Sequence, residues 1–329
     1  MKIVVLDKMT LGDDISLDPI TKNGECELYD NLDSSLIGSV LSDADVCVTN
    51  KKVLGEHNLK DCKNLKLICL TATGYNNVDV EWCKKRGIKV RNVPGYCTES
   101  VCQHTFALLL SLIESITYYD NFVKTGVYTK SGVANHLGKP FYEINGKQWG
   151  IIGMGGIGRE VAKVATAFGA KVIYAPVSGK SRKEIYDEVT LDELFKTSDI
   201  VSIHSPLNAK TENLVNKEKL SLMKKDAVII NVGRGAIVNS HDLVEAVDTG
   251  IIRGAGIDVY PTEPPQADDP FMNIKHPERF VLTPHIAWAS VEARQRCVDI
   301  VGENINSFIE NRGCNDVWYK VLFLTLTVL

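Results

Sequence analysis

The chain has 329 residues, of which 44% are hydrophobic and 24% are charged, and its formal net charge is -4. This composition is that of an ordinary globular protein, and the length suggests roughly two domains. A weakly acidic chain offers no basic surface to nucleic acid, and no apolar run is long enough to cross a membrane as a helix. We therefore expect neither a nucleic-acid partner nor a membrane partner.

The cysteines and the N-terminus bear on location. Nine cysteines are scattered from Cys26 to Cys314 without Cys-x-x-Cys pairing, which predicts reduced thiols, no disulfides and no metal site. The segment from Met1 to Asp7 is a short apolar run that ends in an acid, and it is too short for a signal peptide. The resulting expectation is a cytoplasmic protein.

The first part of the chain alternates short apolar runs with helical or turn segments, as parallel crossover units do. Strands are predicted at 3–6, 46–49, 66–70 and around Val90. Because no glycine fingerprint occurs here, this part is a better candidate for a substrate domain than for a nucleotide site. The segment Thr71–Asp79 follows the third strand, where its small residues could offer backbone amides to an anion. A plain turn into a helix at 79–85 fits the spacing equally well.

A domain crossing is predicted after Pro94-Gly95, which breaks the pattern before a long apolar helix that Thr98 or Ser100 could cap. His104 lies inside this helix, where a buried core histidine is a better interpretation than a catalytic one. The following segment, 125–141, is rich in Gly, Lys and polar residues and indicates a surface loop or hinge.

A glycine fingerprint follows the apolar run at 147–152. It reads Gly-x-Gly-x-x-Gly at Gly153, Gly155 and Gly158, and a helical pattern continues from it. The first glycine permits a tight turn, the second leaves room for a pyrophosphate, and the third lets helix and strand pack closely. The phosphates would lie on the amides at the helix N-terminus. We favour a dinucleotide site over an ordinary strand-to-helix turn.

Further units repeat after the fingerprint. Strands are predicted at 171–175, 199–204, 227–232, 254–259 and 279–282, with a short helix at 191–195. Alternating strands and helices predict an α/β fold with a doubly wound parallel sheet.

The end of the second strand in this series bears on cofactor choice. An NAD-preferring site usually has an Asp or Glu there for the ribose hydroxyls, whereas this chain has Pro176. Polar and basic residues that could bind a 2'-phosphate follow at Ser178, Lys180, Ser181 and Arg182, although a solvated loop is the alternative. We expect NAD or NADP, with NADP slightly favoured.

Three later motifs place polar side chains at strand ends, where open α/β sheets bind ligands. They lie at 231–235, 256–265 and 282–288, and they contribute Arg234, Glu263 and His285. Reduction of a 2-keto acid needs a cation for the carboxylate, a proton donor for the carbonyl oxygen, and a group that orients this donor. Singly, the three residues could be a surface ion pair, a loop acid and a strand-end histidine. Together they favour catalysis.

These motifs, in this order and spacing, resemble the D-isomer-specific 2-hydroxyacid dehydrogenase family over 1–315. The resemblance implies two doubly wound parallel-sheet domains, Rossmann-like and flavodoxin-like, with a cleft between them. Residues 1–98 and 288–329 would form a discontinuous substrate domain, and 99–287 the dinucleotide-binding Rossmann domain. It further implies a homodimer built through the cofactor domains.

The resemblance also implies residue roles. His285 would be the acid/base, Glu263 its partner and Arg234 the substrate clamp, while Asp258 would face the nicotinamide carboxamide. The implied cofactor-binding residues are Gly153, Gly155, Gly156, Ile157, Gly158, Pro176, Ser178, Lys180, Ser205, Pro206, Thr211, Val232, Gly233, Arg234, Asp258 and His285. The implied substrate-binding residues are Thr73, Gly74, Tyr75, Arg234 and Trp288.

Several alternatives remain open. Within the family, 72–79, 92–96, 103–105 and 285–288 are most similar to the glycerate dehydrogenase (hydroxypyruvate reductase) branch, which implies hydroxypyruvate or glyoxylate as substrate. Phosphoglycerate, D-lactate, formate and branched or aromatic acids are alternatives, as is a non-catalytic, nucleotide-sensing corepressor. The apolar tail 317–329 lies beyond the resemblance and could be an added strand, a dimer contact or an irregular end.

Overall fold

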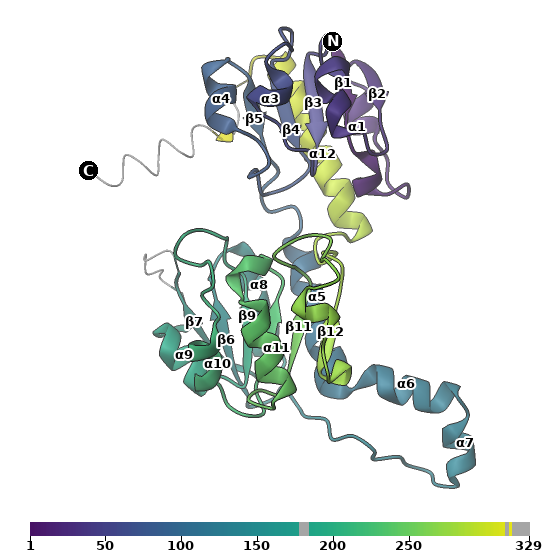
Figure 1. Cartoon of the computed structure of the whole chain (residues 1–329), viewed down its shortest axis with the longest axis vertical. Helices are drawn as coiled ribbons and strands as arrows, with labels where there is room; N and C mark the ends of the chain where they lie inside the picture. The colour runs from purple at the N-terminus through teal and green to yellow at the C-terminus, as the bar shows by residue number, and fades with distance from the viewer. Residues whose placement is uncertain (178–183, 313–315, 318–329) are drawn as a thin grey trace. The chain divides into compact units, whose positions relative to one another are not determined.

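A computed structural model describes residues 1–177, 184–312 and 316–317. The chain divides into two compact units, one formed by Met1–Cys97 with Ala289–Leu329 and the other by Thr98–Trp288, and each is described by itself (Figure 1). The boundaries expected from the sequence were 98/99 and 287/288. The candidate loop residues Ser178, Lys180, Ser181 and Arg182 lie outside the described residues, as does the tail beyond Val317.

The first unit contains a five-stranded parallel sheet in the order β2-β1-β3-β4-β5, which is the flavodoxin-like order. The strands are β1 (Lys2–Val5), β2 (Glu25–Leu28), β3 (Val46–Thr49), β4 (Leu67–Leu70) and β5 (Lys89–Arg91). The helices are η1 (Lys8–Leu11), α1 (Asp18–Thr21), η2 (Ser34–Leu36), α2 (Ile37–Val40), α3 (Glu56–Leu59), α4 (Val80–Lys85) and α12 (Val291–Ile309). Strand β2 was not predicted, because its sequence Glu-Cys-Glu-Leu is polar and suits a partly exposed edge.

The C-terminal helix α12 completes this unit through a buried arginine. Arg91 of β5 donates from Nε to Asp316 Oδ1 at 2.8 Å and from Nη1 to the Ser307 hydroxyl at 3.0 Å. Val317 is buried in the same core. The two ends of the chain are therefore joined in one unit by long-range contacts that no local pattern reveals.

The second unit contains a seven-stranded parallel sheet in the order β12-β11-β10-β9-β6-β7-β8. Its strands are β6 (Gln148–Ile152), β7 (Lys171–Ala175), β8 (Asp187–Glu188), β9 (Ile200–Ile203), β10 (Val228–Asn231), β11 (Gly254–Ile257) and β12 (Phe280–Leu282). Its helices are α5 (Thr98–Glu114), α6 (Ile116–Lys124), α7 (Val127–Ser131), α8 (Gly156–Ala167), α9 (Leu191–Thr197), α10 (Lys217–Leu222), η3 (Gly235–Ile237), α11 (Ser240–Asp248), η4 (Pro270–Met272) and η5 (Pro277–Arg279). The α/β class and both doubly wound sheets are confirmed.

Side-chain caps fix where several helices begin. Thr190 accepts a hydrogen bond from the Glu193 amide before α9, and Asn239 accepts one from the Asp242 amide before α11. Such caps satisfy amide groups that a helix N-terminus leaves unpaired. Helices α9, α10 and α11 then bury Phe195, Leu220 and Leu243 in one core with the sheet.

Helices α6 and α7 form an arm that extends away from the sheet of the second unit before the chain returns to β6 (Figure 1). The prediction of a surface loop over 125–141 is wrong in part, because α7 lies within this segment. Aromatic contacts hold the arm together: the rings of Phe122 and His136 stack with centroids 3.8 Å apart, and the Tyr118 hydroxyl lies 2.8 Å from His136 Nε2.

Candidate active site

The register of the second sheet brings the sequence motifs to one edge. The last paired residues of its central strands form one row: Ala175, Ile152, Ile203, Asn231, Ile257 and Leu282. The residues that follow each of them therefore line up along the carboxyl edge, where parallel α/β sheets bind ligands. Pairing between strands, and not proximity in sequence, assembles the candidate site.

The glycine fingerprint has the geometry that a dinucleotide requires. Gly153 has a φ of 97°, in the left-handed region that favours glycine, and a side chain on Gly158 would collide with the Gly153 carbonyl oxygen. Beside Gly155 no atom lies within 4 Å of where a side chain would begin. Gly156 and Ile157 form the first turn of α8, whose amides favour an anion. These residues fit a bound pyrophosphate.

The ends of β9 and β10 continue the candidate cofactor surface. Ser205 is buried, and its hydroxyl has no hydrogen-bond partner among the described residues. Pro206 is exposed beside it, and Gly233 packs against β9 so closely that a Cβ would lie 3.2 Å from the Ser205 carbonyl oxygen. Val232 is buried. An unpaired buried hydroxyl is unusual and suits a site completed by a ligand.

Thr211 differs from the expectation that it lines the cofactor. It is completely buried, and its hydroxyl donates to the Pro206 carbonyl oxygen at 2.7 Å and accepts from the Asn208 amide at 2.8 Å. Unlike the Ser205 hydroxyl, the Thr211 hydroxyl already has its hydrogen-bond partners within this loop. Thr211 instead shapes the loop that carries Pro206.

The end of β7 has no carboxylate at the described candidate position, Pro176, which is half-buried. Two acids that follow in the described chain are already engaged. Glu188 accepts from the Tyr174 hydroxyl at 2.8 Å, and Glu184 accepts from Arg159 Nε and Nη2 at 2.9 and 2.7 Å. The candidate residues Ser178 and Lys180 lie outside the described part of the chain.

His285 and Glu263 form a close pair. The distance from His285 Nδ1 to Glu263 Oε2 is 2.6 Å, and the other carboxylate oxygen of Glu263 accepts from the Tyr260 amide at 3.1 Å. Both side chains are partly exposed, at 23% and 31%. Because Nδ1 faces the carboxylate, Nε2 is the ring nitrogen left to meet a substrate. The arrangement can orient an imidazole for proton transfer.

Asp258 lies directly beneath this histidine. Its side chain is completely buried, and its carboxylate accepts hydrogen bonds from the Thr283 hydroxyl at 2.6 Å and from the amides of Ile286 and Ala287, both at 2.9 Å. This differs from the expectation that Asp258 faces the nicotinamide carboxamide, because a buried carboxylate with three donors offers no surface to a ligand. Asp258 holds the loop that carries His285.

His104 is also at this edge, so the expectation of a core histidine is corrected. Its side chain is 19% exposed, and Nε2 lies 3.0 Å from the Thr283 hydroxyl oxygen. Thr283 and Tyr260 were missed as supporting residues. The sequence could have indicated them only by position, since each lies near a candidate catalytic residue at a strand end.

Arg234 follows β10 and is exposed. Its Nη1 donates to the Gly233 carbonyl oxygen at 2.8 Å. A side chain on Gly235 would collide with the backbone of Tyr260 and Pro261, so the turn after Arg234 packs directly against the loop that leads to Glu263. The guanidinium is thus carried on a loop adjoining that of Glu263. Trp288 donates from Nε1 to the His285 carbonyl oxygen at 2.9 Å and so stands on the same loop as the histidine.

The remaining substrate candidates belong to the first unit. Thr73 donates from its hydroxyl to the Val93 carbonyl oxygen at 2.9 Å, and Tyr75 packs against the core of that unit. Within the described residues, the amides of Thr73 and Gly74 have no hydrogen-bond acceptor. Binding of an anion by these amides stays a prediction.

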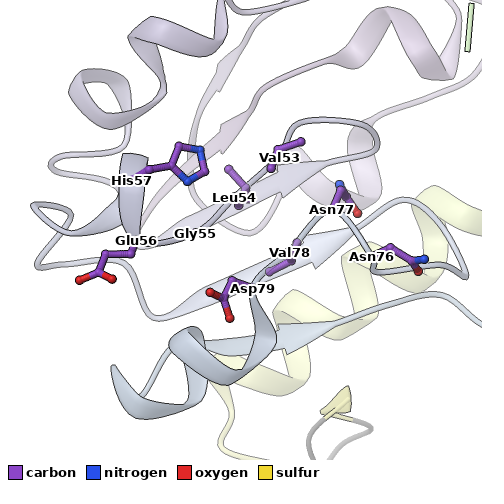
Figure 2. A pocket seen from close by; sticks show the side chains of 9 residues that line it. All are labelled: Val53, Leu54, Gly55, Glu56, His57, Asn76, Asn77, Val78 and Asp79. Atoms are coloured by element: carbon purple, nitrogen blue, oxygen red, sulfur yellow. The ribbon is translucent and has the colours of Figure 1, made fainter. Parts of the chain in front are cut away.

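A hollow of about 620 Å³ lies beside this loop in the first unit (Figure 2). Its ionisable lining comes from Glu56, His57 and Asp79, and Leu54 and Val78, which form an isolated β-bridge, also line it. None of the candidate site residues lines it. In the described ranges no group of three or more His, Cys, Asp or Glu side chains could hold a metal, and no helix there is long and apolar enough to span a membrane.

Comparison with known proteins gives the family. The D-isomer specific 2-hydroxyacid dehydrogenase NAD binding domain matches residues 106–287. The chain belongs to this family. It is 37% identical to a hydroxypyruvate reductase of Blautia hydrogenotrophica over 323 residues, which cover 96% of this chain and 99% of the relative.

Comparison with solved structures finds similar folds among 2-hydroxyacid dehydrogenases. A D-lactate dehydrogenase from Aquifex aeolicus in complex with NAD and lactic acid matches with a TM-score of 0.82 and 27% identity, covering 94% of this chain and 96% of that one. An NADPH-dependent glyoxylate/hydroxypyruvate reductase from Sinorhizobium meliloti in complex with NADP and malonate matches with a TM-score of 0.80 and 26% identity, covering 94% and 93%. The family thus includes relatives bound to either dinucleotide.

Proposed function

We propose that this protein reduces hydroxypyruvate, and the smaller glyoxylate, to the corresponding 2-hydroxy acid with NADH or NADPH, and catalyses the reverse oxidation of D-glycerate. The observation that carries the proposal is the 2.6 Å pair of His285 and Glu263 on a sheet edge shared with the glycine turn. The names of the hydroxypyruvate reductase and glyoxylate/hydroxypyruvate reductase relatives support this substrate class.

The chain's own residues supply binding and proton transfer, while a bound dinucleotide supplies the hydride. Reduction places negative charge on the carbonyl oxygen of the keto acid, and a protonated His285 neutralises it by donating a proton from Nε2. Glu263, at Nδ1, fixes the orientation of the imidazole. Arg234 is proposed to bind the substrate carboxylate through its planar fork, and the amides of Thr73 and Gly74 to assist.

The test is a set of steady-state rates for 2-keto acids with both NADH and NADPH. We expect the highest kcat/KM with hydroxypyruvate, followed by glyoxylate, with pyruvate and branched or aromatic acids lower. A higher kcat/KM with pyruvate or with a branched or aromatic acid would assign this protein a different substrate within the same family. Dinucleotide binding without turnover of any 2-keto acid would favour the nucleotide-sensing corepressor alternative.

We propose further that NADP is slightly preferred over NAD, because Pro176 leaves no carboxylate at the end of β7 to repel a 2'-phosphate. Pro176→Asp should shift preference toward NADH by about tenfold, which corresponds to about 1.4 kcal/mol. The ratio of kcat/KM for the two cofactors measures this, and an unchanged ratio would remove Pro176 from the cofactor site.

We also propose a homodimer built through the second unit, with the α6–α7 arm as its contact. Along this arm Val123, Val133, Leu137 and Phe141 are all more than half exposed, and Leu137 reaches 87%. An apolar arm of this kind gains stability by packing on a second copy. Leu137→Asp should yield monomers in sedimentation, whereas Ile185→Asp, at a position 91% exposed away from the arm, should not.

The eight described free thiols support a cytoplasmic location.

A further inference from the structure

We propose that Thr283 and His104 are positioning residues for the acid/base pair. Together with the buried Asp258, they hold the backbone of His285 in the conformation that lets its ring meet Glu263. The inference rests on the proposed function, since it concerns the same histidine. It assigns roles to two side chains whose hydrogen bonds join His104 to Thr283 and Thr283 to Asp258.

The backbone around His285 requires support. His285 has a φ of 55°, a left-handed conformation that is unfavourable for a residue with a side chain. The His285 amide donates to the Asp258 carbonyl oxygen at 2.7 Å. The next two amides, of Ile286 and Ala287, donate to the Asp258 carboxylate. One residue therefore holds three successive amides of the loop.

The Thr283 hydroxyl completes the shell of this carboxylate, and its hydrogen-bond direction follows from proton counting. The hydroxyl has a single proton, and Asp258 Oδ1, 2.6 Å away, can only accept when ionised. The hydroxyl oxygen must then accept from His104 Nε2, at 3.0 Å. His104 thus carries a proton on Nε2, and the order of donation is His104 to Thr283 to Asp258.

The environment of His104 agrees with this assignment. Burial lowers the pKa of His104, and the nearby Asp258 opposes that shift without overcoming it. A neutral ring with the proton on Nε2 satisfies the donation to Thr283. The Tyr260 hydroxyl adds a brace, since it donates to the Thr283 carbonyl oxygen at 3.2 Å while the Tyr260 amide holds Glu263. The supports of both members of the pair therefore meet at Thr283 and Tyr260.

The experiment compares Thr283→Val, which keeps the shape and removes the hydroxyl, with Thr283→Ser, which keeps the hydroxyl. For Thr283→Val we expect kcat for hydroxypyruvate to fall by at least about tenfold, with the dissociation constant for NADPH changed less than about twofold. Thr283→Ser should retain most of kcat.

His104 provides a second pair of variants. His104→Gln keeps an amide donor and should behave like Thr283→Ser, whereas His104→Leu should behave like Thr283→Val. Wild-type kcat in both Thr283→Val and His104→Leu would overturn the proposal. Equal losses in Thr283→Val and Thr283→Ser would do the same, because they would show that the hydroxyl is not what matters.

Hydrogen exchange separates this inference from the proposed function. The amides of Ile286 and Ala287 should exchange faster in Thr283→Val than in the wild type and Thr283→Ser, whether or not the protein reduces any keto acid. If the wild type is inactive on all 2-keto acids but the exchange pattern holds, the proposed function fails and the positioning of the loop stands. Unchanged protection in Thr283→Val would overturn the positioning role itself.

Discussion

The carboxyl edges of the two parallel sheets differ in what they expose. In the first unit the acid at the edge, Asp7, is buried, and its carboxylate accepts from the amides of Asn50 and Lys51, at 2.9 and 2.7 Å. In the second unit Glu263 and His285 are partly exposed and paired with each other, while Arg234 is exposed. The second edge thus presents accessible ionisable groups in addition to a buried acid, Asp258, like the one at the first edge.

The difference teaches how to separate supporting acids from reacting ones. The carboxylates of Asp7 and Asp258 both accept hydrogen bonds from backbone amides of a loop, so each stabilises the conformation of that loop. Glu263 receives one amide but directs its other oxygen to an imidazole. Changes at the supporting acids should therefore lower stability, and changes at the reacting groups should lower turnover.

The largest effect is expected at His285. His285→Gln removes the proton donor, so kcat for hydroxypyruvate should fall by about a thousandfold or more. Binding of NADPH, followed by fluorescence, should remain measurable because the glycine turn is intact. A variant with nearly normal turnover would exclude His285 as the acid/base.

The next effect is expected at Arg234. Arg234→Lys keeps the charge and loses the planar fork, so two-point binding of a carboxylate cannot be restored. We expect kcat/KM for hydroxypyruvate to fall about a hundredfold while cofactor affinity changes little. If cofactor affinity collapsed instead, Arg234 would belong to the dinucleotide site.

Glu263 tests the pairing. Glu263→Gln keeps the shape and removes the carboxylate charge that faces His285 Nδ1, so the ring loses the partner that orients it. We expect kcat/KM for hydroxypyruvate to fall roughly tenfold while cofactor affinity changes little. Steady-state kinetics with NADPH measure this. Wild-type turnover in this variant would show that another group orients the histidine.

Asp7 tests the supporting role in the first unit. Asp7→Asn replaces one carboxylate oxygen with an NH₂ group, which cannot accept hydrogen bonds from the Asn50 and Lys51 amides. The buried groups left unpaired should lower the free energy of unfolding by about 1–3 kcal/mol. Chemical denaturation measures this, and cofactor affinity should not change. Asp13→Asn, at a side chain that is 94% exposed, is the control and should have little effect.

The smallest effect concerns His204. Burial lowers its pKa to about 3, so the folded protein keeps this ring neutral at pH values where the unfolded chain, titrating near 6.5, takes up a proton. Its contribution to stability is therefore complete above about pH 6.5 and is lost as the pH falls toward 3. Between pH 6.5 and pH 5, protonation of this histidine in the unfolded chain lowers the free energy of unfolding by roughly 1–2 kcal/mol. His204→Gln removes this contribution, so the free energy of unfolding should fall less steeply over the same pH range. The exposed His241→Gln should leave the slope unchanged.

Local patterns determined much of the fold from the sequence. Apolar runs predicted β3 and β7 with their observed bounds, and the glycine fingerprint predicted the turn at Gly153, because only a residue without Cβ tolerates its φ of 97° beside β9. Polar residues just after strands marked Arg234, Glu263 and His285, because a parallel sheet gathers such positions on one edge. The polar edge strand β2 and the two-residue β8 lacked any such pattern.

The tertiary structure alone decided which polar groups support and which are accessible. Nothing local shows that Asp258 is buried under the Ile286 and Ala287 amides, or that His104, far earlier in the chain, reaches Thr283. Burial and hydrogen bonding between distant segments depend on the pairing of β10, β11 and β12 and on the packing of α5 against them. Periodicity in the sequence reports which face of an element is apolar, but a side chain's charge, exposure and partner are fixed only when these elements come together.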